Sequence, residues 1–76
     1  MARMRVVATV CYQQLEGGFW GLVGDDGRKY RPLEGLPEAH RVSGAKVRVE
    51  LERARAVGVC MWGRAVRVES IEAVAD

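Results

Sequence analysis

The chain has 76 residues, of which 49% are hydrophobic and 29% are charged, and its net charge is +2. This composition is typical of a globular protein, and no apolar run approaches the roughly 20 residues of a transmembrane helix, so we expect no membrane partner. A chain this short buries only about 60% of the surface that it exposes when unfolded, so we expect residues 1–76 to form a single small domain.

The first predicted strand covers Met4–Gln13. It is rich in valine, and both of its faces are apolar in the middle, as expected of a central strand. The basic and then apolar N-terminus is similar to a signal peptide, but Thr9 interrupts the apolar run and no small-residue cleavage site follows. We therefore expect a strand here, in a cytoplasmic protein.

A glycine-rich hairpin follows, because the stretch LEGGFWGLVGDDGRKYRPL carries five glycines. We predict strands over Phe19–Gly24 and Lys29–Leu33, joined by a type I′ turn at Asp26-Gly27, because these residue types tolerate the positive φ that this turn requires. Gly21 predicts a bulge or a tight bend in the first of these strands. Pro32 cannot donate to a ladder, so the second strand is predicted to lie at an edge or to end there.

The second half of the chain begins with a connector. Pro37–Arg41 is predicted to form one short helical turn, because proline suits the first turn of a helix. Lys46–Arg55 alternates between apolar and charged residues, which predicts a strand with one solvated face. Val59–Val68 is predicted as a fifth strand, in which Gly63 can introduce a bend. The tail beyond it either extends this strand or forms a last helical turn, with Ile71 and Val74 packed inward.

Three strands, a short helical connector and two strands are the element order of an OB-fold, a five-stranded Greek-key barrel. We therefore predict an all-β, five-stranded OB-like Greek-key barrel with one short helical turn between strands 3 and 4. A split sandwich and an SH3-like barrel are the alternatives. The glycines support the barrel, because short strands must coil sharply to close.

Several motifs follow one another between about Thr9 and Val68: a Gly-Gly-aromatic strand, an Asp-Gly hairpin, a tyrosine, a Leu-Pro pair and a late Met-Trp-Gly. In this order they resemble a group of short prokaryotic OB-fold-like β-barrel proteins of unassigned role. The resemblance implies the same barrel and no particular activity. Cys60 precedes Met-Trp-Gly here, where the resemblance leads us to expect a polar residue or histidine, so no shared metal or ligand role is implied there.

Catalytic chemistry finds little support in the sequence. His40 is the only histidine, and Ser43 and Ser70, the only serines, do not lie in a nucleophile-elbow context. Cys11, Cys60 and His40 are scattered, whereas structural zinc needs about four ligands, usually in close pairs. We expect both cysteines to be buried and His40 to be solvated. The sequence therefore predicts no catalytic residues, no metal site and no cofactor.

Binding is the class of function that remains. OB barrels bind oligonucleotides and oligosaccharides on the face of strands 2 and 3. We predict a weak site for single-stranded nucleic acid there, with aromatic rings that stack on bases and cations that meet phosphates. Its residues are Trp20 (with Phe19 as the alternative on the opposite face), Tyr30, Arg28, Lys29 and Arg31. The modest net charge permits this function without arguing for it, and the competing prediction is a protein-interaction or self-associating module that buries the outward aromatic.

Overall fold

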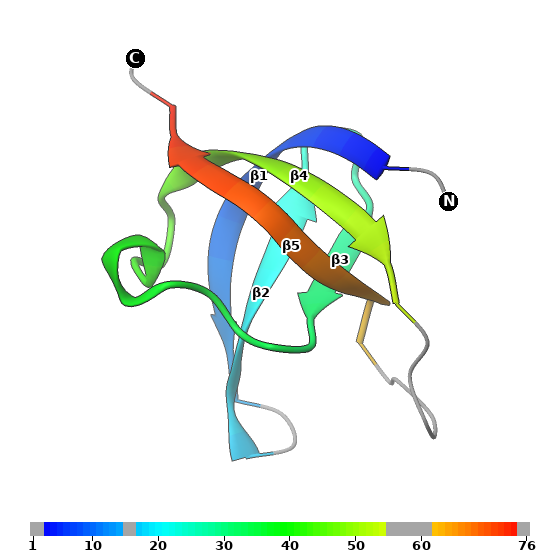
Figure 1. The fold of residues 1–76 in the computed structure, drawn as a ribbon. Helices are drawn as coiled ribbons and strands as arrows, with labels where there is room; N and C mark the ends of the chain where they lie inside the picture. The colour runs from blue at the N-terminus through cyan, green and yellow to red at the C-terminus, as the bar shows by residue number, and fades with distance from the viewer. Residues whose placement is uncertain (1–2, 15–16, 55–61, 75–76) are drawn as a thin grey trace.

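The computed structural model describes residues 3–14, 17–54 and 62–74. Its strands close into one barrel in the order β1-β2-β3-β5-β4, and β1 pairs with β4 to complete the ring (Figure 1). The pairs are antiparallel, except that β3 runs parallel to β5. This confirms the predicted all-β, closed five-stranded barrel with one short helical turn between strands 3 and 4. The elements are β1 (Arg3–Gln13), β2 (Phe19–Gly24), β3 (Lys29–Pro32), the 3-10 turn η2 (Glu38–His40), β4 (Lys46–Arg53) and β5 (Arg64–Ala73).

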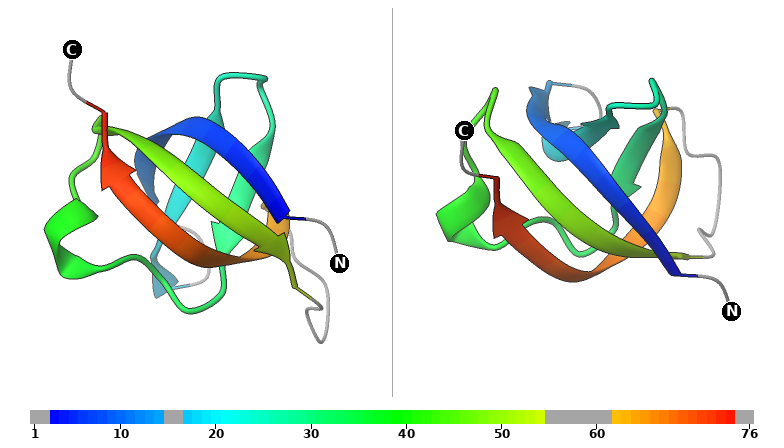
Figure 2. Two further views of the ribbon diagram at one scale, coloured as in Figure 1. Left: turned by 45° about the horizontal axis from the view of Figure 1, so that its top comes forward. Right: turned by 90° about the horizontal axis from the view of Figure 1, so that it is seen from above.

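Closure depends on the length and curvature of β1. Its C-terminal part pairs with β2 from Ala8 to Gln13, whereas its N-terminal part pairs with β4 from Arg3 to Thr9. Figures 1 and 2 show the strand curving from one neighbour to the other. Ala8 lies where the two ladders overlap and is fully buried. Its side chain joins the core at this bend.

The core fills the inside of the barrel and follows the alternation of the strands. Side chains at every second position of a strand point to the same side, and in β1 and β4 these are the valines and other apolar residues noted in the sequence. Leu36 joins the core from the connector between β3 and β4, and its carbonyl oxygen accepts a hydrogen bond of 2.8 Å from Nε of Arg41. The central members of the core are Ala8, Val10, Leu22, Tyr30, Leu36, Val47, Val49, Leu51 and Val66.

The predicted elements differ from the observed ones mainly near β5. The strand begins at Arg64, because Trp62 and Gly63 form a bend, and it continues to Ala73. The tail therefore extends the strand, which was the first of the two predicted alternatives. Residues 55–61, which hold the predicted end of the fourth strand and start of the fifth, lie outside the described residues. Within the described residues, no helix is long and apolar enough to cross a membrane.

Two local predictions about glycine are corrected. The ladder between β1 and β2 runs without interruption through Gly21, so the predicted bulge is absent there, and the irregular register lies instead between β4 and β5 at Glu50 and Leu51. In the hairpin, the Gly24 carbonyl accepts a hydrogen bond of 2.9 Å from the amide of Gly27, whose φ is +85°. The amide of Gly24 also donates to the carbonyl oxygen of Arg28 at 2.7 Å, so three residues lie between this pair, one more than in the predicted two-residue type I′ turn.

Candidate functional site

Alternation along β2 and β3 determines which side chains lie on the outer face of the barrel. Leu22 and Tyr30 pair across the two strands, and both side chains are buried in the core. The neighbours of Tyr30 in β3, Lys29 and Arg31, therefore lie on the outside of the barrel. Phe19 and Gly21 share this outer side on β2.

Two aromatic rings meet on this outer face. Phe19 and Trp62 form an edge-to-face pair, with ring centroids 5.4 Å apart and ring planes at 63°. Such pairs contribute about 0.5–1.5 kcal/mol beyond the area that they bury. Trp62 comes from the bend that precedes β5 and is only 8% exposed. A segment distant in sequence thus covers part of the outer face of β2.

Gly21 makes room for the indole of Trp62. A Cβ atom at position 21 would lie 2.4 Å from Cη2 and 2.5 Å from Cζ3 of that ring, closer than real side chains approach. Gly63 makes a second close approach, because its Cβ would lie 2.9 Å from the carbonyl oxygen of Lys29, and its φ is +70°. The two missing side chains let the Trp62 segment lie directly on β2 and β3, which explains Gly21 better than a bulge does.

Two cations lie over the two rings. The Cζ atom of Arg31 is 4.3 Å from the ring centroid of Phe19, and the Nζ atom of Lys29 is 5.7 Å from that of Trp62. Both distances fall within the roughly 6 Å over which a cation is attracted to the face of a ring. Across the described ranges, no ion pair involves Lys29. We call Phe19, Lys29, Arg31 and Trp62 the cation–aromatic cluster.

The structure places the predicted aromatic residues elsewhere. Tyr30 is 1% exposed, so its ring cannot stack on a base, and its hydroxyl donates to Oδ2 of Asp26 at 3.3 Å. Burial raises the pKa of Tyr30, and the adjacent Asp26 carboxylate raises it further. Trp20 is half-buried, packs against the core and makes an edge contact with Tyr12, with centroids 5.0 Å apart. Phe19 and Trp62 therefore take the place of Trp20 and Tyr30 in the candidate site.

The predicted cations divide into two groups. Lys29 and Arg31 belong to the cluster. Arg28 lies in the hairpin loop, where its amide donates to Oδ1 of Asp26 at 2.9 Å and its Nε lies 4.0 Å from Oδ2 of the same residue. The charge of Arg28 is thus partly balanced within its own turn.

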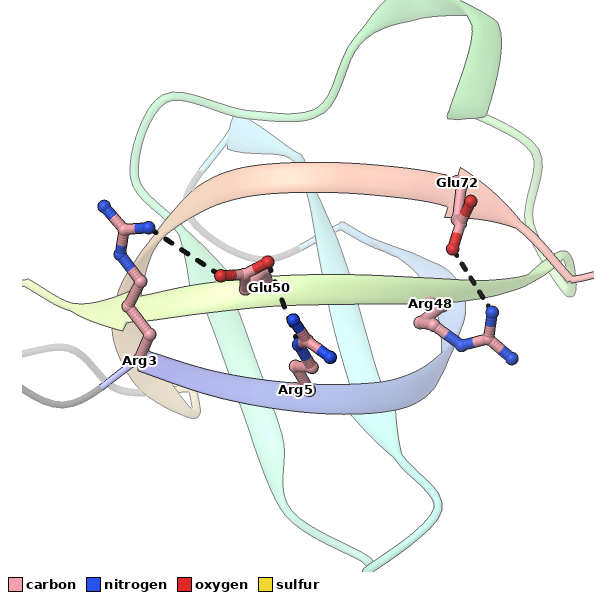
Figure 3. Close-up of polar contacts among 5 residues, drawn as sticks. All are labelled: Arg3, Arg5, Arg48, Glu50 and Glu72. Carbon is pink, nitrogen blue, oxygen red and sulfur yellow. Dashed lines mark hydrogen bonds and ion pairs between the residues drawn. The ribbon is translucent and has the colours of Figure 1, made fainter.

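A second outer face, formed by β1, β4 and β5, is strongly charged, and its three arginines share the carboxylates of Glu50 and Glu72. Figure 3 shows Glu50 between Arg3 and Arg5, and Arg48 beside Glu72. The nitrogen–oxygen distances are 3.8 Å and 4.0 Å from Glu50 to the two arginines, and 3.2 Å from Arg48 to Glu72. We call these five residues the paired-charge face. A shallow groove of about 510 Å³ runs over it, but each arginine there already faces a carboxylate.

The described residues contain no group of three or more histidine, cysteine, aspartate or glutamate side chains placed to hold a metal ion. His40 is half-buried in η2, rather than fully solvated as predicted. Cys11 is also half-buried, on the outer side of β1 opposite Gly21, and its Sγ accepts a hydrogen bond of 2.9 Å from the side-chain Nε2 of Gln13. It is therefore not the core residue that we predicted, whereas Cys60 lies outside the described residues.

No family model, curated protein or solved structure matches this chain. The resemblance to short prokaryotic barrel proteins therefore stays a prediction. A barrel of this kind carries many unrelated functions, so function has to be argued from the site. The cation–aromatic cluster is the arrangement of described side chains whose chemistry most clearly points to a ligand.

Proposed function

We propose that this barrel is a non-catalytic, cytoplasmic module that binds single-stranded nucleic acid on the outer face of β2 and β3. The observation that carries the proposal is the cation–aromatic cluster, in which Lys29 and Arg31 each lie over an aromatic ring. Nonspecific single-strand binding sites combine aromatic side chains with a basic surface that follows the phosphates. The cluster has both parts, on the face that OB barrels use for oligonucleotides.

The spacing of the cations supports an extended strand as the ligand. Lys29 and Arg31 are two residues apart on β3, which corresponds to about 6.7 Å along a strand. This is close to the separation of neighbouring phosphates in an extended single strand. The ligand backbone is therefore proposed to follow β3, with successive phosphates at the two cations. Unpaired bases are required, because only these can turn toward a planar side chain.

The proposal predicts a weak and moderately salt-dependent affinity. For single strands, the logarithm of the binding constant falls with the logarithm of salt concentration with a slope of about −0.7 for each neutralised phosphate, so two contacts give a slope of about −1.4. Fluorescence anisotropy of a labelled short oligothymidine would measure it. A slope near zero, or no binding at low salt, would overturn the proposal.

Tryptophan emission gives a second test of the same site. In a Trp20→Phe variant, Trp62 is the remaining tryptophan of the chain. Its emission should change on addition of oligothymidine, because Trp62 contacts both Phe19 and Lys29. The matched Trp62→Phe variant, which retains Trp20 on the inner side of β2, should show a smaller change. Equal changes in the two variants would place the ligand elsewhere.

The alternative, a protein-interaction or self-associating module, draws on different residues. Leu33 and Val42 belong to the connector between β3 and β4 and are 46% and 58% exposed. Neither is part of the cation–aromatic cluster. Sedimentation equilibrium of the intact protein, compared with that of a Leu33→Ser/Val42→Ser variant, distinguishes the two functions. Association that disappears in this variant, without loss of oligothymidine binding, would favour two separate surfaces.

A further inference from the structure

The second half of β5 runs beyond its neighbour β3. The two strands pair only from Arg64 to Val66, whereas β5 continues to Ala73 with β4 along its other side. Among the described residues, no backbone hydrogen bond joins residues 67–73 to any element other than β4. The connector before η2 passes beside this stretch and leaves a groove of about 510 Å³, with residues 67–71 along one side (Figure 1). We call the side of residues 67–73 that faces away from β4 the β5 edge; such an edge is a template for another strand.

Two hydrogen bonds show which backbone groups point out of the β5 edge. Along an antiparallel ladder, the amide and carbonyl groups of successive residues point alternately toward the partner strand and away from it. The carbonyl oxygen of Val66 accepts from the connector and so points away from β4, whereas the amide of Val74 donates to β4. Counted from these two positions, the groups of Val68 and Ile71 both point away from β4, on the side of the groove.

A bulge in β5 makes this edge irregular. Glu69 is an extra residue, because its neighbours Val68 and Ser70 pair with consecutive residues of β4. Val68 and Ile71 therefore lie on the same side of the strand although they are three residues apart, and both pack against the core. In a regular strand, equivalent positions are two residues apart. A regular strand from another protein would consequently fall out of register with the β5 edge.

We infer that the β5 edge pairs with the β5 edge of a second copy of this chain, in an antiparallel and twofold-symmetric homodimer that joins residues 67–72. The second copy carries the same bulge, so the two edges stay matched on both sides of it. Val68 then lies opposite Ile71 of the second copy, and each of these residues donates a backbone hydrogen bond to the other and accepts one from it. Because the interface is isologous, every contact occurs twice.

The charged side chains of this register are complementary. Arg67 lies opposite Glu72 of the second copy, at the roughly 4.5–5.5 Å between Cβ atoms of paired residues, where opposite charges stabilise a strand pair and like charges weaken it. Within its own chain, Arg67 lies 3.2 Å from Glu34, and Glu72 lies 3.2 Å from Arg48. The dimer contact therefore joins two existing ion pairs into one row of alternating charges.

Sedimentation equilibrium of the intact protein, from micromolar to millimolar concentrations and without oligothymidine, measures this dimer. We expect it to be weak, because a single strand pair buries little surface. Arg67→Glu and Glu72→Arg each place like charges opposite each other twice, so each should raise the dissociation constant at least about fivefold. The double variant restores opposite charges and should return to within about twofold of wild type. Arg64→Glu is the matched control, because this exposed residue lies where β3 already pairs with β5.

Amide hydrogen exchange tests the backbone pairing without a substitution. The amides of Val68 and Ile71 should exchange more slowly as the protein concentration rises, whereas that of Glu72, which faces β4, should not change. A protein that stays monomeric throughout overturns the inference and leaves the proposed function intact, because the cation–aromatic cluster lies on another face. A dimer that ignores the charge reversals, or that depends instead on Leu33 and Val42, forms through another surface and also overturns it.

Discussion

The cation–aromatic cluster and the paired-charge face use the same kind of side chain in different surroundings. On the paired-charge face, Arg3, Arg5 and Arg48 lie 3.2–4.0 Å from the carboxylates of Glu50 and Glu72. In the cluster, the cations lie over aromatic rings, which attract a positive charge without neutralising it. A ring thus orients the ammonium of Lys29 without neutralising it, whereas a carboxylate offsets the charge of the arginines beside it. The surroundings of the cations, rather than their number, distinguish the candidate site.

The largest expected effect comes from displacing the Trp62 ring, which packs directly on Gly21 of β2. Gly21→Ala would place a Cβ atom 2.4 Å from the ring of Trp62, so the indole must move. Overpacking of this kind costs about 1–3 kcal/mol in the free energy of unfolding. We expect a lower Tm, weaker oligothymidine binding and, in a Trp20→Phe background, altered Trp62 emission.

Cys11→Ala is the control for this substitution, because Cys11 lies opposite Gly21 on the same outer side and Ala adds no atoms. It should leave the Trp62 emission as it is. If Gly21→Ala leaves both the emission and the Tm unchanged, Trp62 does not rest on β2 in solution, and the cluster is not assembled as described.

The next prediction distinguishes oligothymidine binding at the cation–aromatic cluster from general electrostatic attraction between oligothymidine and the protein. Lys29→Ala and Arg5→Ala each remove one positive charge from an exposed strand residue, one from the cluster and one from the paired-charge face. Lys29→Ala should reduce the magnitude of the salt slope for oligothymidine by about 0.7, the value of one phosphate contact. Arg5→Ala should leave the slope near the wild-type value. Equal reductions in the two variants would mean that net charge, and not the cluster, holds the ligand.

The fold was largely predictable from local patterns, because the strands with the clearest alternation were predicted most accurately. Val47, Val49 and Leu51 all face inward as predicted, since a charged residue separates each from the next. The start of β5 was not predictable in this way. Gly63 indicated a bend within the predicted strand. The sequence did not indicate that Trp62 packs against Gly21 of β2, 41 residues earlier, or that the strand begins only after this bend.

The candidate site was predictable in part. One error, the placement of Tyr30 on the same face as the two cations, was avoidable from strand alternation alone. Tyr30 stands between Lys29 and Arg31, so alternation places its ring on the opposite side of the strand from the two cations. The same argument groups Trp20 with Leu22 on the inner side of β2 and leaves Phe19 outside. The role of Trp62 carried no such signal, because nothing local to Trp62 shows which strand it covers.

A smaller effect is expected from changing Tyr30, whose buried side chain lies between the outward-facing Lys29 and Arg31 on β3. Tyr30→Phe removes the hydrogen bond to Asp26, which should cost about 0.5–1.5 kcal/mol at neutral pH. Burial raises the pKa of Tyr30 above 10.0, with a further rise from Asp26, so the folded protein binds this proton more tightly than the unfolded chain does. The resulting stability is present below about pH 10 and is lost as the pH rises through the folded pKa.

Urea unfolding at neutral and alkaline pH measures this dependence. Wild-type protein should lose more stability than Tyr30→Phe as the pH rises above about 10, because only the wild type must ionise or expose the Tyr30 phenol. Tyr12, which is 43% exposed, is present in both proteins and provides the background titration. Parallel pH profiles for the two proteins would show that Tyr30 is accessible to solvent, which would contradict its place in the core.

The smallest effect is expected on the paired-charge face, where both partners of each ion pair reach solvent. Arg48→Ala removes a pair whose side chains are 57% and 65% exposed, and exposed pairs contribute only about 0.2–1 kcal/mol. The difference in unfolding free energy should shrink further as salt rises, because screening weakens the pair, and oligothymidine affinity should not change. A marked loss of affinity in Arg48→Ala would mean that the groove over this face takes part in binding. The paired-charge face and the cation–aromatic cluster would then no longer divide the molecule into an inert face and a binding face.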